Sequence, residues 1–300
     1  MSVVATSLSE RRDRPTLGIV TFVGNLLLMA FLSAMVKQLS MSFPLSEILL
    51  FRFIFASSLF WGVLFSTGGL VVLRTSRPVD HAIRSLSGVV SLALMYFALA
   101  RIPIADATAL SYAAPIFITV LSIFVLGESI GFRRWLAVIV GFVGVLLIAQ
   151  PGGAGWSIGV AAAAGSAVTA AVVAIWLRRL SSSERSVTIG VYYNSTGTLL
   201  CLAWLLLFSD AVMPQGMQWP FLLLFGLFCA GQQWLLTISF RYAEASLLAP
   251  FEYLAMIFAA VVGFAFWGEI PVLTTWLGGL VIAASGLFIF KRKQQIKASQ

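Results

Sequence analysis

The sequence predicts an all-α polytopic membrane protein whose ten transmembrane helices form two inverted five-helix repeats. The first observation is composition: 60% of the residues are apolar and 10% are charged, whereas soluble domains carry about a quarter charged residues. Apolar runs of about 20 residues recur along the chain, each long enough to cross a hydrocarbon core about 30 Å thick. The third observation is that the two halves match at one fixed offset of 141 residues.

From the apolar runs we expect ten spans, at residues 17–36, 46–66, 83–101, 104–126, 135–150, 157–177, 187–208, 219–240, 245–267 and 273–290. Helices are expected because the runs are too long and too continuously apolar for barrel strands. The first repeat then covers 17–150 and the second 157–290, with a tail of residues 1–16 before them, a basic tail of residues 291–300 after them, and Pro151–Gly155 as the hinge.

The repeat is gap-free and joins residues of distinctive chemistry. The matched residues include tyrosine, tryptophan and Gly-Glu pairs: Tyr112 with Tyr253, Trp135 with Trp276, and Gly127-Glu128 with Gly268-Glu269. Because each half holds an odd number of spans, the second half must enter the bilayer from the opposite side. Such inverted repeats are typical of secondary transporters, in which one substrate site lies between the repeats.

Basic residues gather on one side of the predicted bundle. With the N-terminus in the cytoplasm, sixteen Lys and Arg residues face the cytoplasm, Lys37 and Arg101 lie outside, and Arg52 lies within a span. This bias predicts that both termini are cytoplasmic. The net charge of +8 therefore indicates topology, and we expect no nucleic-acid partner.

Several function classes lack the residues they need. The hinge is followed by no Lys-Ser/Thr and preceded by no strand, so it is not a phosphate loop, and nothing resembles an ATPase module. Cys201 and Cys229 both fall in spans, which indicates neither a disulfide framework nor a metal site. The only histidine, His81, is expected in a basic surface loop. We therefore expect no catalytic residue, no metal and no cofactor.

The fourth predicted span carries polar side chains on one helical stripe, which would face the bundle interior or water. The stripe comprises Thr108, Ser111, Tyr112, Pro115, Thr119 and Ser122, and the offset relates it to Ala249, Glu252, Tyr253, Met256, Ala260 and Gly263 in the ninth span. We expect Ser111, Tyr112, Glu252 and Tyr253 to contact substrate across a central cavity. The alternative is that small residues merely permit close helix packing.

Glu252 is the one carboxylate well inside a span. An acid at bilayer depth costs about 2.5–3.5 kcal/mol on insertion scales, so it should lie near water or a partner, or be protonated. It is our candidate for proton coupling, and the alternative is a structural hydrogen bond beside the helix break at Pro250. Pro115 should break the fourth span too, but the prolines are not equivalent by the offset, so the two breaks need not match.

Arg52 is the other charge inside a span. It could hold a substrate carboxylate or phosphate, pair with Glu47, or extend to the outer interface. The remaining candidate substrate contacts are amide, hydroxyl and aromatic side chains within spans: Asn25, Ser91, Tyr96, Gln232, Gln233 and Trp234. Aromatic groups beside amides suit a flat or amphipathic solute, although most aromatics in such a chain serve packing.

The segments from Ile104 to Glu128 and from Ala245 to Glu269 resemble the ten-helix EamA-type branch of the drug/metabolite transporter superfamily. Each begins with an Ala-containing helix start and closes with Leu-Gly-Glu or Trp-Gly-Glu. The likeness runs from Leu17 to Phe290. It implies a bacterial inner-membrane carrier whose cavity is lined by the first, third, fourth, sixth, eighth and ninth helices. Members move amino acids, vitamins, nucleotide-like cofactors and other metabolites.

The leading hypothesis is therefore a secondary transporter for a small organic metabolite, an amino acid or a relative, working by export. Its partners would be that solute, the lipid bilayer and, as the candidate coupling ion, the proton. Uptake of a vitamin such as riboflavin, or of S-adenosylmethionine, is the alternative. A membrane-embedded enzyme acting on lipid intermediates would need a cluster of acids, histidines or metal ligands that the sequence does not offer, and a non-transporting scaffold would leave the polar stripes unexplained.

Overall fold

The computed structural model describes residues 15–67, 69–126, 132–150, 157–181, 183–208, 211–243 and 245–298. The elements are α2 (Pro15–Leu39), α3 (Leu45–Thr67), η2 (Gly69–Leu73), α4 (Pro78–Leu99), α5 (Ile104–Ser111), α6 (Ala114–Leu126), α7 (Phe132–Ala149), α8 (Ile158–Leu180), α9 (Ser186–Phe208), α10 (Gln218–Tyr242), α11 (Ala245–Leu248), η3 (Ala249–Tyr253), α12 (Leu254–Trp267) and α13 (Leu273–Ala298). The expected hinge and the Gly127-Glu128 turn lie outside the described residues.

The expectation of ten spans is confirmed. Seven described helical segments are long and apolar enough to cross a membrane, and three shorter apolar helices cover Trp135–Ala149, Phe251–Trp267 and Leu273–Phe288. The described residues form helices and no strand. Helix α13 continues to Ala298, so most of the expected basic tail is helical.

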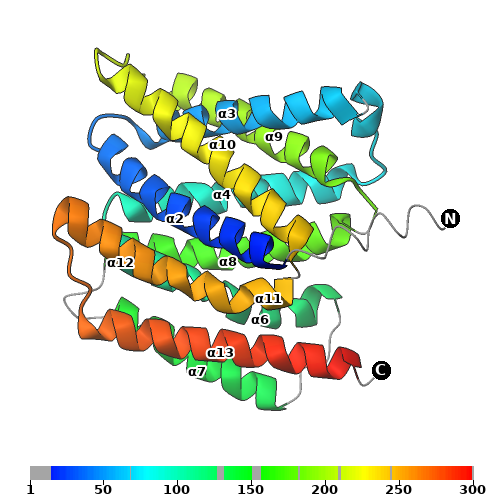
Figure 1. Cartoon of the computed structure of the whole chain (residues 1–300), viewed down its shortest axis with the longest axis vertical. Helices are drawn as coiled ribbons and strands as arrows, with labels where there is room; N and C mark the ends of the chain where they lie inside the picture. Colours follow the sequence, from blue (N-terminus) through cyan, green and yellow to red (C-terminus); the bar gives the residue numbers. More distant parts are fainter. Residues whose placement is uncertain are drawn as a thin grey trace.

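The helices pair as an inverted repeat requires. The offset of 141 residues relates α2 to α8 and α4 to α10, and the structure packs α2 on α10 and α4 on α8. Two further pairs, α3 with α9 and α7 with α13, each join a helix to its own repeat partner and lie toward opposite edges of the bundle (Figure 1). Across the first of these, Ser57 Oγ lies 3.1 Å from Thr198 Oγ1, and these two residues are 141 apart. The pseudo-twofold axis therefore passes between α3 and α9.

Helix α2 begins and α13 ends at the same end of the bundle (Figure 1). We call this the Pro15 end, which the charge distribution predicts to be cytoplasmic, and the opposite one the Lys37 end, since Lys37 lies in the last turn of α2.

Both the fourth and ninth spans are broken, and the breaks match. Helix α5 ends at Ser111 and α6 begins at Ala114, while η3 ends at Tyr253 and α12 begins at Leu254. The offset maps Tyr112 onto Tyr253, so the helix resumes at nearly the same place in each repeat although the prolines differ. Pro115 disturbs the turn before it, because it lacks an N–H and clashes with the carbonyl four residues back. Pro250 is the second residue of the 3₁₀ turn η3, which begins at Ala249 and ends at the equivalent position.

The expectation that His81 lies in a surface loop is wrong. Helix α4 begins at Pro78, one and a half turns before the apolar run, and places His81 in its first turns with 2% of its surface exposed. Proline suits the first position of a helix, and Asp80 in the first turn favours the positive end of the helix dipole. The prediction from apolar content alone, residue 83, therefore placed the start of this helix five residues too late.

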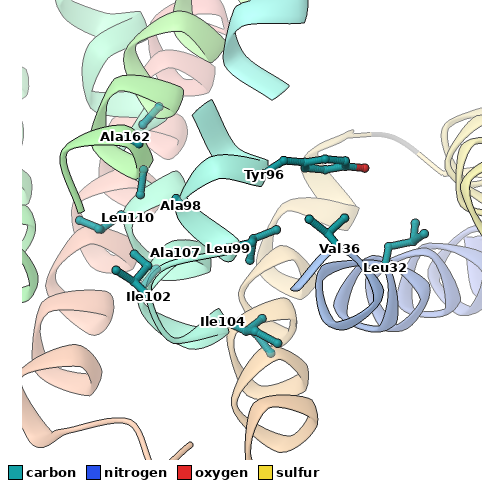
Figure 2. Packing of buried hydrophobic residues seen from close by; sticks show 14 of the residues in the cluster. Leu32, Val36, Tyr96, Ala98, Leu99, Ile102, Ile104, Ala107, Leu110 and Ala162 are labelled. Atoms are coloured by element: carbon teal, nitrogen blue, oxygen red, sulfur yellow. The ribbon is translucent and has the colours of Figure 1, made fainter. Parts of the chain in front are cut away.

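The core forms where α2, α4, α5 and α8 meet. Val36 of α2, Ile104 and Ala107 of α5 are fully buried, and Leu99 of α4 is 1% exposed. Figure 2 shows these side chains gathered between the helices. Elsewhere large apolar side chains such as Phe124, Phe208 and Ile270 are exposed, as expected for a surface covered by lipid.

Candidate functional site

Tyr112 and Tyr253 meet where the two broken spans face each other. Their ring centroids are 5.4 Å apart at an interplanar angle of 58°. The Tyr112 hydroxyl donates a 2.7 Å hydrogen bond to the backbone carbonyl of Glu252, and the Tyr253 hydroxyl donates a 3.1 Å bond to the carbonyl of Ala283. A break in a helix leaves backbone groups without their usual partners, and Tyr112 satisfies one of them from the other repeat.

A second pair of polar contacts joins the helices around this centre. On one side, Gln232 Nε2 of α10 donates a 2.7 Å hydrogen bond to Asn25 Oδ1 of α2. On the other, Ser91 Oγ of α4 donates a 3.0 Å bond to the backbone carbonyl of Ser166 in α8. The offset relates Asn25 to Ser166 and Ser91 to Gln232, so these are equivalent contacts in the two repeats. The first joins two side chains inside the bundle and the second binds a backbone oxygen.

Arg52 lies next to Tyr96 rather than to Glu47. Its Nη1 is 3.4 Å from the Tyr96 hydroxyl, and its guanidinium carbon lies 5.9 Å from the centre of that ring. Tyr96 is 5% exposed and extends from α4 toward α2 (Figure 2). Glu47 Oε2 instead accepts a 3.1 Å hydrogen bond from the backbone N–H of Val212. Among the described contacts, the Arg52 cation therefore has the Tyr96 phenol and the Cys229 thiol beside it and no carboxylate.

The other predicted contacts are more scattered. Ser111 Oγ donates a 2.6 Å bond to the carbonyl of Thr108 in its own helix, and the Thr108, Thr119 and Ser122 hydroxyls also bond within their helix. Gln233 is half-buried, the Glu252 side chain is exposed, and Trp234 is 53% exposed. Tyr112 is thus the stripe residue whose side chain hydrogen-bonds to the opposite repeat.

The sequence reasoning did not find an ion pair at the Lys37 end. Lys37 Nζ contacts Glu269 Oε1 and donates a 3.1 Å hydrogen bond to the carbonyl of Ile102. Glu269 Oε2 accepts a 3.0 Å bond from the backbone N–H of Ile104, the first residue of α5. Glu269 follows Gly268, whose φ of 65° ends α12 in the left-handed conformation that glycine adopts freely. We call these contacts of Lys37, Glu269, Ile102 and Ile104 the Lys37 latch.

The chain belongs to the EamA-like transporter family, whose model matches residues 16–150 and 157–291. It is therefore a transporter of the drug/metabolite transporter superfamily and not an enzyme.

Named relatives differ in what they carry. The pseudopaline exporter CntI of Pseudomonas aeruginosa (strain UCBPP-PA14) is 29% identical over 265 residues, covering 88% of this chain and 92% of the relative. The riboflavin transporter of Rhizobium johnstonii is 29% identical over 296 residues, covering 97% and 96%. A crystal structure with 21% sequence identity matches at a TM-score of 0.60 over 92% of this chain and 96% of that one, which shows the fold alone.

Replacing Tyr112 or Tyr253 with alanine should weaken substrate binding about tenfold, which corresponds to a loss of about 1.4 kcal/mol of binding free energy. The phenylalanine variants should fold with only the loss of one hydrogen bond, about 1 kcal/mol. Transport by variants expressed at equal levels measures the effect. If both alanine variants transport normally, the facing tyrosines do not contact substrate.

Proposed function

We propose that this protein exports a small organic metabolite, an amino acid or a related compound, across the bacterial inner membrane by alternating access, with both termini in the cytoplasm. The observation that carries the proposal is the pair of broken spans, four and nine, whose tyrosines meet at the pseudo-twofold axis. Broken helices at the interface of inverted repeats are where secondary transporters bind substrate. The Asn25–Gln232 and Arg52–Tyr96 contacts add polar groups on the helices around that point.

Alternating access requires that the two ends open in turn. In the structure the Lys37 latch joins the end of α2, the start of α5 and the turn before α13. The structure thus supports a state closed at the Lys37 end, and release of the latch would open that end.

Uptake of a vitamin or nucleotide-like cofactor, such as riboflavin or S-adenosylmethionine, is the second candidate. Its support is the riboflavin transporter to which this chain is 29% identical over nearly its whole length. Tyr112 and Tyr253 at the centre, and Tyr96 beside Arg52, are aromatic side chains that would stack on a flat ring.

One experiment separates these candidates. Metabolites inside and outside cells are compared with and without the protein, at equal growth. Export predicts that one amino-acid-like metabolite accumulates outside only when the protein is present, and uptake predicts that a supplied vitamin or cofactor accumulates inside. If no metabolite changes on either side, the transport proposal fails.

Glu252→Gln should abolish accumulation driven by a pH gradient while leaving exchange of substrate against substrate intact. The substitution preserves shape and removes titration at Glu252, the carboxylate in the 3₁₀ turn of the broken ninth span. Transport into vesicles with and without an imposed pH gradient measures both activities. Glu184→Gln, an acid on the loop before α9, is the matched control and should retain both. Full gradient-driven transport by Glu252→Gln would make this acid structural.

A further inference from the structure

One group of buried polar atoms has no hydrogen-bond partner, and all its members lie near the Pro15 end. Among the described residues, the buried side-chain nitrogen and oxygen atoms without a partner are Nδ1 and Nε2 of His81, Nε and Nη1 of Arg84, Oγ of Ser85 and Nε1 of Trp176. We call these four residues the donor cluster. Buried polar groups in native proteins are nearly always hydrogen-bonded, so these six atoms require a ligand or another explanation.

Three members share the first turns of α4, where α8 and α9 pack against it. His81 and Ser85 are 2% and 1% exposed, and the His81 ring lies 4.4 Å from that of Tyr192 in α9. The Arg84 guanidinium carbon lies 3.9 Å from the centre of the Tyr193 ring. This ring, with which the guanidinium also hydrogen-bonds, holds Arg84 in place while Nε and Nη1 stay without a partner.

The fourth member, Trp176, comes from α8 at the same depth. Helices α4 and α8 run antiparallel: Gly159 packs against Arg101 and Ile102, and Ser166 accepts a hydrogen bond from Ser91. Continuing this register along α8 brings Trp176 opposite the turn from His81 to Arg84. The indole N–H is therefore at the level of the other unpartnered groups.

The chemistry of the donor cluster selects an anion. Arginine and the indole N–H donate hydrogen bonds and cannot accept them, and the serine hydroxyl and histidine can donate. Two acids lie close enough to His81 to interact with it electrostatically, but each already has partners: Asp80 lies 3.6 Å from Arg179 and 3.9 Å from Arg77, and Glu184 accepts a 2.6 Å bond from Thr75. A buried cation surrounded by donors and without a carboxylate is suited to an incoming oxyanion.

We propose that the donor cluster is an anion subsite that binds the carboxylate or phosphate group of the transported solute at the Pro15 end. This inference rests on the proposed transport function and adds a substrate class to it. It favours solutes that carry a carboxylate or phosphate over neutral ones such as riboflavin. Arg52 lies farther along the same interface: its neighbour Phe53 packs edge-on against Tyr193 at 5.4 Å, so a second cation follows the first toward the Lys37 end.

The test is thermal unfolding of the purified full-length protein in detergent, with sodium phosphate or sodium succinate titrated against sodium chloride at equal ionic strength and pH. A ligand that binds only the folded state raises the midpoint, by about 3 °C at roughly ten times its Kd for a protein of this size. We expect this shift for wild type with at least one of the two oxyanions and none with chloride.

Variants locate the site. Arg84→Gln should lose the shift, and Arg185→Gln, an exposed arginine at the same end of the bundle, should retain it. Arg84→Lys keeps the charge without the planar donor group and should bind several-fold more weakly, which preserves the test if the glutamine variant does not fold. Trp176→Phe keeps the ring, removes one donor and should also weaken binding. An equal shift in Arg84→Gln, or no shift in wild type with either oxyanion, overturns the proposal.

A lipid phosphate is the other source of the same chemistry, and a second arm separates it. The protein is reconstituted in discs of zwitterionic lipid with or without phosphatidylglycerol. If only the anionic lipid stabilises wild type, and Arg84→Gln abolishes that effect, the cluster binds lipid and the solute proposal is wrong. The metabolite comparison is independent of these results, so transport of a neutral solute would leave the proposed function standing while this inference fails.

Discussion

Replacing Gly278 with leucine should lower the thermal midpoint of the purified protein by about 6 °C or more, or abolish folded protein. A Cβ atom at Gly278 would lie 2.6 Å from the carbonyl oxygen of Gly144, and one at Gly144 would lie 2.8 Å from the carbonyl oxygen of Gly278. Because the obstacle is backbone on both sides, no side-chain rotation relieves it, and α7 and α13 must separate. Overpacking of this kind costs about 3 kcal/mol.

The control is Gly62→Leu in α3, because a Cβ at Gly62 has no neighbouring atom within 4 Å. It adds the same apolar volume to a helical glycine without a clash. Thermal unfolding followed by size-exclusion chromatography compares the two variants. Equal midpoints would mean that the close α7–α13 approach contributes nothing to stability.

Replacing Lys37 with methionine should open the Lys37 end and raise the reactivity of Cys229 about tenfold, equivalent to a 1.4 kcal/mol shift in the equilibrium between closed and open states. Lys37 and Glu269 have side chains only 13% and 16% exposed, so removing one partner leaves a poorly solvated charge. Cys229 is 2% exposed and lies one turn before Gln232, whose amide bonds to Asn25 of α2. The latch joins α2 to the ends of α5 and α12 and not to α10, so the labelling rate reports whether freeing α2 there also loosens its packing on α10.

The measurement is the rate of maleimide labelling in a Cys201→Ser background. Arg101→Met removes an exposed cation at the same end, where Arg101 stacks on Phe97 at 3.4 Å, and should leave the rate unchanged. The double variant Lys37→Met with Glu269→Gln tests coupling, since its effect should be smaller than the sum of the single effects. An unchanged rate in Lys37→Met would show that the latch does not hold this end closed.

The fixed offset between the two halves explains why so much of the fold could be predicted from the sequence. An offset that joins Tyr112 to Tyr253 fixes which helices are equivalent, and an odd number of spans per half fixes the inversion. These facts do not by themselves give the contact between the two tyrosines, since a residue and its equivalent meet only on the axis and the equivalents Asn25 and Ser166 bond to other residues. Helix starts were less predictable. Helix α4 begins at Pro78, before its apolar run, because proline and an acid favour a helix start there. His81 therefore lies in the protein interior and not in the loop that the apolar run predicts.

The sequence by itself determined the class of this protein, the number of its spans and the inverted relation of its halves, because hydropathy and an internal repeat are properties of the chain. Only the tertiary structure decided which polar groups meet. Glu269 reads as a turn residue until α2 brings Lys37 against it, and Arg84 reads as one more basic residue near the cytoplasm until Tyr193 covers its guanidinium. Partners of a charge lie on other helices at sequence separations that no local pattern encodes, so packing alone shows whether that charge is paired, buried or left to bind a ligand.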